Sequence, residues 1–332
     1  MQAQIRMAEH AKADMAIRLK TKIAVPEVFG HDLSADNEVG APYILMSYMH
    51  GTSAAELSEL RDCDPETSGT AEQDARFRQQ MANIHVQLAS LTFDRIGSLR
   101  ESHDNPGDFF IGSEIETGEG PWDTAQQYYS AVARHRLQVA EHDAEPEVRE
   151  CDSFNLPHRF CELMPLLQSR ETRPYGLANR DFGAHNVLVD DDFNIIGLID
   201  FDGVIAAPIE LVAQLPLFTG LERPIPGFVE TGEFALKRIE RTKHQVPQYI
   251  EFVSGAIAEA EATVGLADSS GLADAMVSDA ASAVQGMNAY GQHQGFVNDR
   301  WMAAYAMLLE KAMGSSDFPG LELDKGPSHK AK

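Results

Sequence analysis

Apolar residues recur with two different periods along the chain, and these periods predict where helices and strands lie. The segment Met1–Lys20 is rich in Ala, Met, Lys, Gln and Glu and has no internal Gly or Pro, which predicts a helix. Pro26 breaks this pattern, and the stretch VPEVFGHDL then predicts a short strand. The apolar run Tyr43–Met49, closed by Gly51, predicts a buried strand that leads into a connector.

A helical spacing of apolar residues dominates the rest of the chain. Within Arg76–Leu91 they fall on one face, and Thr124–Val139 and Asn155–Gln168 also predict helices. The intervening stretch Arg100–Pro121 is rich in Gly, Asp and Ser, which predicts a loop. Three later groups at helical spacing are Ile250, Val253, Ile257 and Val264; Leu272, Met276, Ala280, Ala283 and Met287; and the segment Trp301–Leu309.

One β-hairpin interrupts this helical part. Val187–Val189 predicts a strand, DDDFN a tight turn, and Ile195–Asp200 a second strand. Strands therefore come first and a helical body with one hairpin follows, which is typical of an α+β fold rather than of an alternating βαβ sheet. The polar tail from Gly314 predicts disorder.

The charge balance narrows the range of partners. The 332 residues include 27 Lys and Arg against 51 Asp and Glu, which gives a formal net charge of −24. Such a chain repels phosphate backbones and anionic bilayers, so neither nucleic acid nor a membrane is expected as a partner. A cationic substrate is compatible with the sign, although a solvated surface explains most of the charge.

Cysteine usage and hydropathy point to the cytoplasm. The cysteines Cys63, Cys151 and Cys161 are scattered and odd in number, which is typical of a reducing compartment and gives no zinc-binding pattern. The apolar runs are too short to span a bilayer, and the N-terminus lacks the apolar core of a signal peptide. The sequence does not predict an oligomeric state.

The residues that can carry chemistry gather around the predicted hairpin. Asp181 and Asn186 lie on a loop before its first strand, and Asp200 ends its second strand. Antiparallel pairing brings these ends together. One carboxylate can then orient a hydroxyl nucleophile and accept its proton, while an amide oxygen and a second carboxylate can hold Mg²⁺ on phosphates. The set predicts phosphoryl transfer.

The stretches DFGAHNVLV and IIGLID, with TKIAVPEVFGHDL, GAPYILMSYMHG and QLASLTFDRIGSL, resemble aminoglycoside phosphotransferase-like proteins of the protein-kinase-like superfamily, especially the fungal set. The resemblance runs from about Thr21 to about Leu309. It implies an α+β kinase-like fold whose mainly helical C-lobe carries the catalytic hairpin. It also implies an incomplete N-lobe over residues 1–50 (a helix, two strands and a hinge), a C-lobe over 51–313 and a disordered tail over 314–332.

The resemblance also implies roles for individual residues. Asp181 would be the catalytic base, and Asn186 and Asp200 would bind Mg²⁺. Backbone groups near Ser47 and Met49 would hydrogen-bond the adenine of ATP. The implied reaction transfers the γ-phosphoryl group of ATP to a hydroxyl of a small molecule, which the sequence does not identify.

Several positions depart from the family pattern or allow two interpretations. Asn179 and Arg180 replace the usual His and Gly before the catalytic Asp181. Asp202 either faces the metal or caps the following turn, and His185 is interpreted as structural rather than as a substrate contact.

The family also carries three strands, a glycine-rich phosphate loop and a lysine before the first helix, which this chain does not show. We therefore expect a truncated N-lobe with weak ATP binding and low activity. Glu9 is interpreted as a solvated helix charge rather than as the partner of that lysine.

Two other functions remain open from the sequence. A pseudokinase-like binding module without catalysis would explain the missing phosphate loop. LIDFDGVI also resembles the first motif of haloacid-dehalogenase-type phosphatases, in which Asp200 and Asp202 would be nucleophile and general acid. The phosphatase interpretation is weaker, because the motif follows a hairpin and leaves Asp181 and Asn186 without a role.

Overall fold

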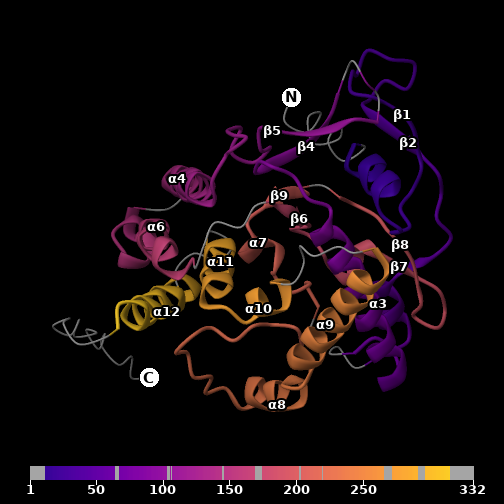
Figure 1. The fold of residues 1–332 in the computed structure, drawn as a ribbon. Helices are drawn as coiled ribbons and strands as arrows, with labels where there is room; N and C mark the ends of the chain where they lie inside the picture. Colours follow the sequence, from indigo (N-terminus) through magenta and orange to yellow (C-terminus); the bar gives the residue numbers. More distant parts are fainter. Residues whose placement is uncertain are drawn as a thin grey trace.

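A computed structural model describes residues 12–63, 67–102, 105, 107–143, 146–168, 174–201, 203–218, 220–264, 271–290 and 296–314 (Figure 1). Three sequence predictions lie outside these residues. They concern the first part of the N-terminal helix with Glu9, the tail over 315–332, and Asp202. Residues 12–20 are helical, in agreement with the prediction for that part of the chain.

The predicted hairpin is confirmed and belongs to a three-stranded sheet. Among the described residues, β3 (Thr52–Ser53), β7 (Val187–Val189) and β8 (Ile195–Leu198) pair in the order β3-β7-β8, all antiparallel. The tight turn is held by Asp190, whose carboxylate accepts the backbone N–H groups of Asp192 and Asn194 at 2.9 Å each. The acidic turn therefore stabilises the hairpin.

A second, four-stranded sheet was not predicted, and the prediction of a loop over Arg100–Pro121 is wrong. The described strands β5 (Phe109–Gly112), β4 (Gly97–Glu101), β9 (Ile205–Ala207) and β6 (Gly176–Ala178) pair in that order. Each strand has five residues or fewer, so none shows a periodic pattern long enough to stand out from its polar surroundings. The helical body consequently contains more sheet than one hairpin.

The predicted helices are confirmed, with shifted ends. Thr70 precedes the long α3 as its N-cap, and its side chain forms a capping box with that of Gln73. The helix buries Phe77, Met81 and Leu88. The segment predicted as one helix over Leu272–Met287 is two helices, because Ser278 caps a new one by accepting the N–H of Ala281. Besides the helix over 12–20, the helices of the described residues are α2 (Ala54–Leu60), α3 (Ala71–Ser90), α4 (Ala125–Asp143), α5 (Pro146–Arg149), α6 (Leu156–Leu167), α7 (Ile209–Val212), α8 (Glu233–Thr242), α9 (Gln245–Val264), α10 (Leu272–Met276), α11 (Asp279–Ala289) and α12 (Phe296–Ala312).

Helices surround the two sheets on several sides. In Figure 1, α9 runs alongside α3, and these two helices pack closely. On the other side, α6 packs against α4, α11 and α12. Buried residues from both sides belong to one hydrophobic core. Among the described residues, no helix is both long and apolar enough to cross a bilayer.

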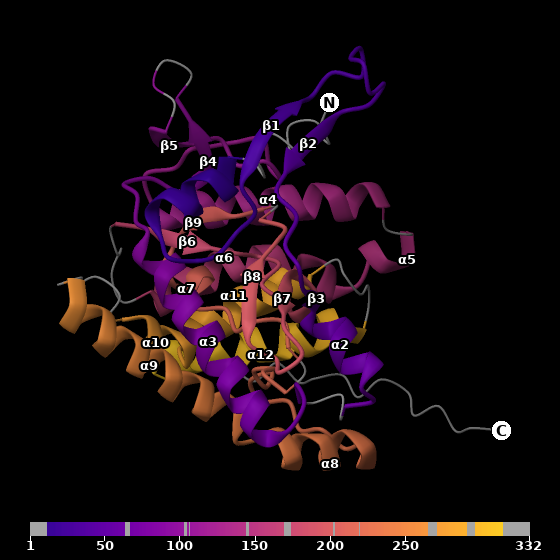
Figure 2. The same ribbon diagram turned by 90° about the vertical axis from the view of Figure 1, so that its right-hand side faces the viewer.

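A two-stranded ribbon projects from this body near the N-terminus (Figure 2). It is formed by β1 (Val28–Asp32) and β2 (Tyr43–Met46) in antiparallel pairing. The predicted strand is present but shorter than Tyr43–Met49, and it is not buried. Leu45 is 57% exposed and Phe29 is 63% exposed. In the described structure β2 pairs with β1 alone, so the ribbon leaves apolar side chains in contact with solvent.

The segment before the ribbon is anchored on the helical body. Ala16 and Ile17 are both buried in the described structure, and Ile17 belongs to the same hydrophobic core as the helical body. The chain after helix 12–20 runs beside β8, where the N–H of Leu198 donates to the carbonyl of Ala24 at 2.9 Å. The N-terminal segment is therefore part of the main core.

Candidate active site

The loop between β6 and β7 holds Asp181 in a network of short local hydrogen bonds. Asn179 Oδ1 accepts the backbone N–H of Asp181 at 3.0 Å, and the carbonyl of Asp181 accepts the N–H of Gly183 at 2.9 Å. A short 3-10 turn, Ala184–Asn186, then leads into β7. Asn179 thus supplies one of the hydrogen bonds that fix the loop.

Asn186 joins this loop directly to the carboxylate of Asp181. Its Nδ2 donates to the carbonyl oxygen of Asp181 at 3.1 Å and to Oδ2 of the same residue at 3.0 Å. Asn186 is buried, whereas the Asp181 side chain is about half exposed. Because the amide nitrogen contacts Asp181, Oδ1 remains as the oxygen that the side chain can offer to a cation.

Asp200 lies at the same end of the hairpin. Val187 pairs with Leu198, and the N–H of Ile199 donates to the carbonyl of Asn186 at 3.0 Å. Asp200 follows with a φ of 61°, which turns the chain away from the strand direction. A left-handed Asp is more common than other non-glycine residues in that region and often marks a functional turn. The structure therefore brings Asp181 into contact with Asn186 and places Asp200 one residue from the backbone contact of Asn186.

The oxygens at this end of the hairpin fit Mg²⁺. This cation prefers carboxylate, amide and phosphate oxygens and uses few protein ligands. Asn186 and Asp200 offer one amide oxygen and one carboxylate, and the orientation of Asn186 leaves its oxygen available. The residues present are compatible with a metal shared between protein and nucleotide phosphates.

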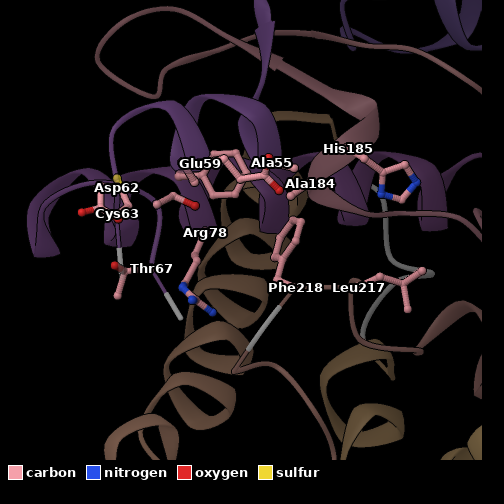
Figure 3. A pocket seen from close by; sticks show the side chains of 13 residues that line it. Ala55, Glu59, Asp62, Cys63, Thr67, Arg78, Ala184, His185, Leu217 and Phe218 are labelled. Carbon is pink, nitrogen blue, oxygen red and sulfur yellow. The ribbon is translucent and has the colours of Figure 1, made fainter. Parts of the chain in front are cut away.

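A cavity of about 610 Å³ opens beside the loop that holds Asp181 (Figure 3). His185 lines it and also contacts Asp181, with Nε2 3.2 Å from Oδ2. Its side chain is 52% exposed. The histidine that we interpreted as structural therefore connects the candidate base to the cavity. In Figure 3 it lies at one end of the lining residues.

The walls of the cavity have different chemical characters. Phe77 and Phe218 form an apolar part, with ring centroids 5.4 Å apart. On the other side α2 and the turn after it contribute the exposed carboxylates of Glu59 and Asp62. Arg78 also reaches the lining, but its Nε donates to the buried Asp74 at 2.8 Å. The cavity suits a small molecule with one apolar face and polar or positively charged groups.

The predicted adenine-binding segment follows the ribbon. The N–H of Ser47 donates to the carbonyl of Glu27 at 2.8 Å, and Ser47 Oγ accepts the N–H of Glu27 at the same distance. The amide of Ser47 is thus already bonded, and the predicted contact with adenine would have to use its carbonyl or groups of Met49. The carbonyl of Met49 accepts the N–H of Gly51 at 3.1 Å.

Comparison with a family model shows to which protein family the chain belongs. The model of the phosphotransferase enzyme family, APH, matches residues 3–209, more than half of the chain. The chain belongs to this family. The family resemblance drawn from the sequence motifs is thereby confirmed, and the mixture of helices and antiparallel sheets agrees with the predicted α+β fold class. No curated protein sequence matches the chain.

Solved structures with a similar arrangement include three phosphotransferases at low sequence identity. A thermostable mutant of aminoglycoside phosphotransferase APH(4)-Ia shares 14% identity over 92% of this chain and 84% of its own, with a TM-score of 0.43. A putative aminoglycoside phosphotransferase from Ralstonia eutropha shares 9% identity over 95% of this chain and 85% of its own, with a TM-score of 0.44. Macrolide 2′-phosphotransferase type I shares 12% identity over 92% of this chain and 79% of its own, with a TM-score of 0.44.

One group near the site of this phosphotransferase-family chain was not found from the sequence. Arg180, noted only as a departure from the family pattern, contacts the turn after β5 through Glu114 and Glu116. That turn lies in the stretch Arg100–Pro121, which was predicted as a loop. The acidic residues in SEIETGEG were a visible signal, but only folding brings them to Arg180.

Proposed function

We propose that this chain transfers the γ-phosphoryl group of ATP to a hydroxyl group of a small molecule, with Asp181 as the base. The observation that carries the proposal is the hydrogen-bonded pair of Asp181 and Asn186 at the end of the hairpin that also holds Asp200. Membership of the phosphotransferase enzyme family supports it.

The proposed step is an in-line displacement at the γ-phosphorus, in which one P–O bond forms and another breaks. The acceptor O–H bond breaks, its proton passes to the carboxylate of Asp181, and the acceptor oxygen forms a bond to the γ-phosphorus. The bond from that phosphorus to the bridging oxygen breaks, and ADP leaves with the electron pair. Asn186 keeps the carboxylate oriented by donating to Oδ2.

In this proposal Asn186 and Asp200 hold Mg²⁺, which supplies positive charge against the phosphate oxygens when it is bound. The carbonyl of Ser47 and the backbone of Met49 bind the adenine. Asn179 supports Asp181 through the hydrogen bond to its amide. We further propose a cytoplasmic location and an acceptor that is not a nucleic acid, since the net charge of −24 disfavours polyanions.

The acceptor would bind in the cavity beside His185. Its hydroxyl would lie toward Asp181, its apolar face against Phe218, and a positively charged group toward Glu59 and Asp62. Cavities of this volume are typical of small-molecule sites.

The phosphatase alternative is not favoured. In that class the first motif follows a strand of a parallel βαβ sheet, whereas β8 lies in an antiparallel sheet with β7. The non-catalytic alternative is separated from the proposed function by experiment, since it allows binding of nucleotide or acceptor without turnover.

The test is ATP consumption by the purified chain with Mg²⁺ and a panel of amino alcohols, polyols and hydroxylated cations. We expect Asp181→Asn to lower turnover by about 100-fold or more, since it removes the general base. Asn186→Ala and Asp200→Asn should raise the Mg²⁺ concentration needed for half-maximal rate. Asp191→Asn is a matched control, because that carboxylate is 96% exposed at the far turn of the same hairpin.

Undiminished turnover in Asp181→Asn would contradict the assignment of the base. Binding of Mg·ATP without turnover on any acceptor would favour the binding-module alternative.

A further inference from the structure

The four-stranded sheet places residues of three separate chain segments in one row. Its register aligns Gly112 of β5 with Ser98 of β4, Ser98 with Ile205 of β9, and Ile205 with Ala178 of β6. Because β6 and β9 are antiparallel, the residues that follow β6 and those that precede β9 leave this row in the same direction, and the turn after β5 starts from the same row. The segment before β9 comes from the turn after Asp200, and the segment after β6 leads into the catalytic loop.

Arg180 spans these three segments. Its Nε donates to the carbonyl of Gly203 before β9 at 3.0 Å. Its Nη1 donates to Glu116 Oε2 at 2.8 Å and forms an ion pair with Glu114 Oε1 at 2.9 Å, both in the turn after β5. The residue directly before Asp181 is thus fixed to two other parts of the chain through one planar guanidinium group.

The two glutamates are themselves held in place. The side chain of Glu114 has no exposed surface, and its Oε2 accepts the N–H of Thr117 at 2.8 Å. Glu116 also pairs with Arg136 on α4 at 3.3 Å. Burial alone would raise the pKa of Glu114, but the charge of Arg180 and the hydrogen bonds from Thr117 outweigh it and lower the pKa. The carboxylate therefore stays charged and the cluster forms a fixed support.

We propose that Arg180 is a positioning residue, which sets the catalytic loop with Asp181 against the segment that carries Asp200. The inference rests on the proposed function in taking these two carboxylates as base and metal ligand. Arg180 itself touches neither of them in the described contacts, and it acts through Gly203 and through the backbone next to Asp181. A guanidinium is suited to this role, because its nitrogens bond in several fixed directions at once, which an ammonium does not do.

A simpler role for Arg180 would be to neutralise the buried Glu114. Arg180→Ala alone does not separate the two roles, because it leaves Glu114 buried without its cation and destabilises the fold in either case. The double variant Arg180→Ala with Glu114→Gln removes both charges and isolates the positioning role. Arg180→Lys keeps the charge without the planar group. Arg134→Gln is the control, since Arg134 forms an exposed ion pair with Glu119 in the same turn.

The experiment measures thermal unfolding, amide hydrogen exchange by mass spectrometry, and Mg·ATP turnover on the full chain. We expect the double variant to recover most of the thermal stability lost in Arg180→Ala. Peptides that contain Asp181 or Val204 should still exchange about tenfold faster than in the wild type. Turnover should show kcat lowered on the order of 100-fold, with KM for ATP changed by less than about threefold, because misplacement of reacting groups affects mainly the chemical step.

Arg180→Lys should have near-wild-type stability and an intermediate kcat, and Arg134→Gln should match the wild type. Recovery of slow exchange at both peptides in the double variant would overturn the proposal and leave Arg180 as a counter-ion of Glu114. If the double variant does not fold, Arg180→Lys decides by the same exchange measurement, and wild-type exchange in it overturns the proposal.

The exchange readout does not depend on catalysis. If the wild type consumes no ATP, the proposed function fails. Faster exchange at both peptides in the folded double variant then still supports the link between the two segments, and unchanged exchange overturns it.

Discussion

Asn186 arranges much of the candidate site before any ligand binds. Its side chain donates to the carbonyl and to the carboxylate of Asp181, and its backbone carbonyl accepts the N–H of Ile199. An amide suits this position better than a carboxylate, because a second negative charge about 3 Å from Asp181 would raise the pKa of one of the two groups. The same side chain can thus orient the base and still present an oxygen to a cation.

The carboxylates of the cavity make a testable contribution to acceptor choice. We expect Glu59→Gln with Asp62→Asn to raise KM about 5- to 10-fold for a positively charged acceptor that gives turnover, with kcat nearly unchanged. The size is modest because exposed charge pairs contribute on the order of 1 kcal/mol. The measurement is steady-state kinetics with that acceptor and with a neutral analogue that lacks the amine.

The neutral analogue should show little change in KM. Glu56→Gln serves as the control, because Glu56 is exposed on α2 outside the cavity lining. Equal effects on the charged and neutral acceptors would argue against a cation contact at Glu59 and Asp62.

The strand β8 connects the candidate site to the N-terminal segment. Gly197 lies where Met49 and the backbone of Ala24 approach the strand closely, and a Cβ atom there would come within 2.8 Å of the Ala24 carbonyl oxygen. The neighbouring Leu198 donates its N–H to that same carbonyl. A side chain at this position would separate two elements that the glycine allows to touch.

We therefore expect Gly197→Ala to lower the free energy of unfolding by about 1–3 kcal/mol, the usual cost of overpacking a close contact. Urea unfolding followed by circular dichroism measures the change. Gly30→Ala is the matched control, because no atom lies within 4 Å of a Cβ at that position in β1. It should change stability by less than about 1 kcal/mol. Equal stability of the two variants would show that β8 tolerates the added methyl group.

The core of the molecule contains a buried histidine that connects α3, α7 and α9. His85 contacts the hydroxyl of Tyr249 through Nδ1 at 3.2 Å and the carbonyl of Val212 through Nε2 at 2.7 Å. Its ring also meets that of Phe182, directly after Asp181, at 5.6 Å. Burial lowers the pKa of His85 from 6.5 to about 4, although the bond to Val212 partly opposes the shift. The folded chain therefore keeps this imidazole neutral.

The free energy of unfolding should decrease as the pH falls, because His85 is kept neutral in the folded chain. Below pH 6.5 the unfolded chain binds a proton at this residue, whereas the folded chain does so only near pH 4. Its contribution is thus fully present above pH 6.5 and decreases between 6.5 and 4, by about 1.4 kcal/mol per pH unit. Urea unfolding at pH 7 and pH 5 should show that the stability difference between wild type and His85→Gln shrinks by about 2 kcal/mol at the lower pH.

The wild type and His85→Gln share all other titratable groups, so the effects of those groups on the free energy of unfolding cancel in the difference. His142→Gln on the exposed end of α4 is the control and should follow the wild type at both pH values. A constant difference between the wild type and His85→Gln would contradict the neutral state of the buried ring.

Several features of this protein follow from the sequence alone, because they depend on interactions between near neighbours. The hairpin of β7 and β8 is specified by apolar runs on both sides of a turn whose first Asp bonds the next few amides. The contact of Asp181 with Asn186 spans five residues, so the motif itself contains it. Helices such as α3 are visible as a 3.6-residue period with a capping residue. These signals were sufficient to predict the family and the fold class and to propose the catalytic residues.

Tertiary structure alone decided the other features, because they join segments far apart in the chain. The four-stranded sheet pairs short strands whose patterns carry no period of their own, and so Arg180 could not be connected with Glu114 from the sequence. Ile17 is buried in a hydrophobic core to which residues distant in the sequence contribute. The cavity likewise combines α2, α3 and the loop between β6 and β7. Local periodicity reports which face of an element is apolar, but the partner that covers this face is selected only when the chain packs.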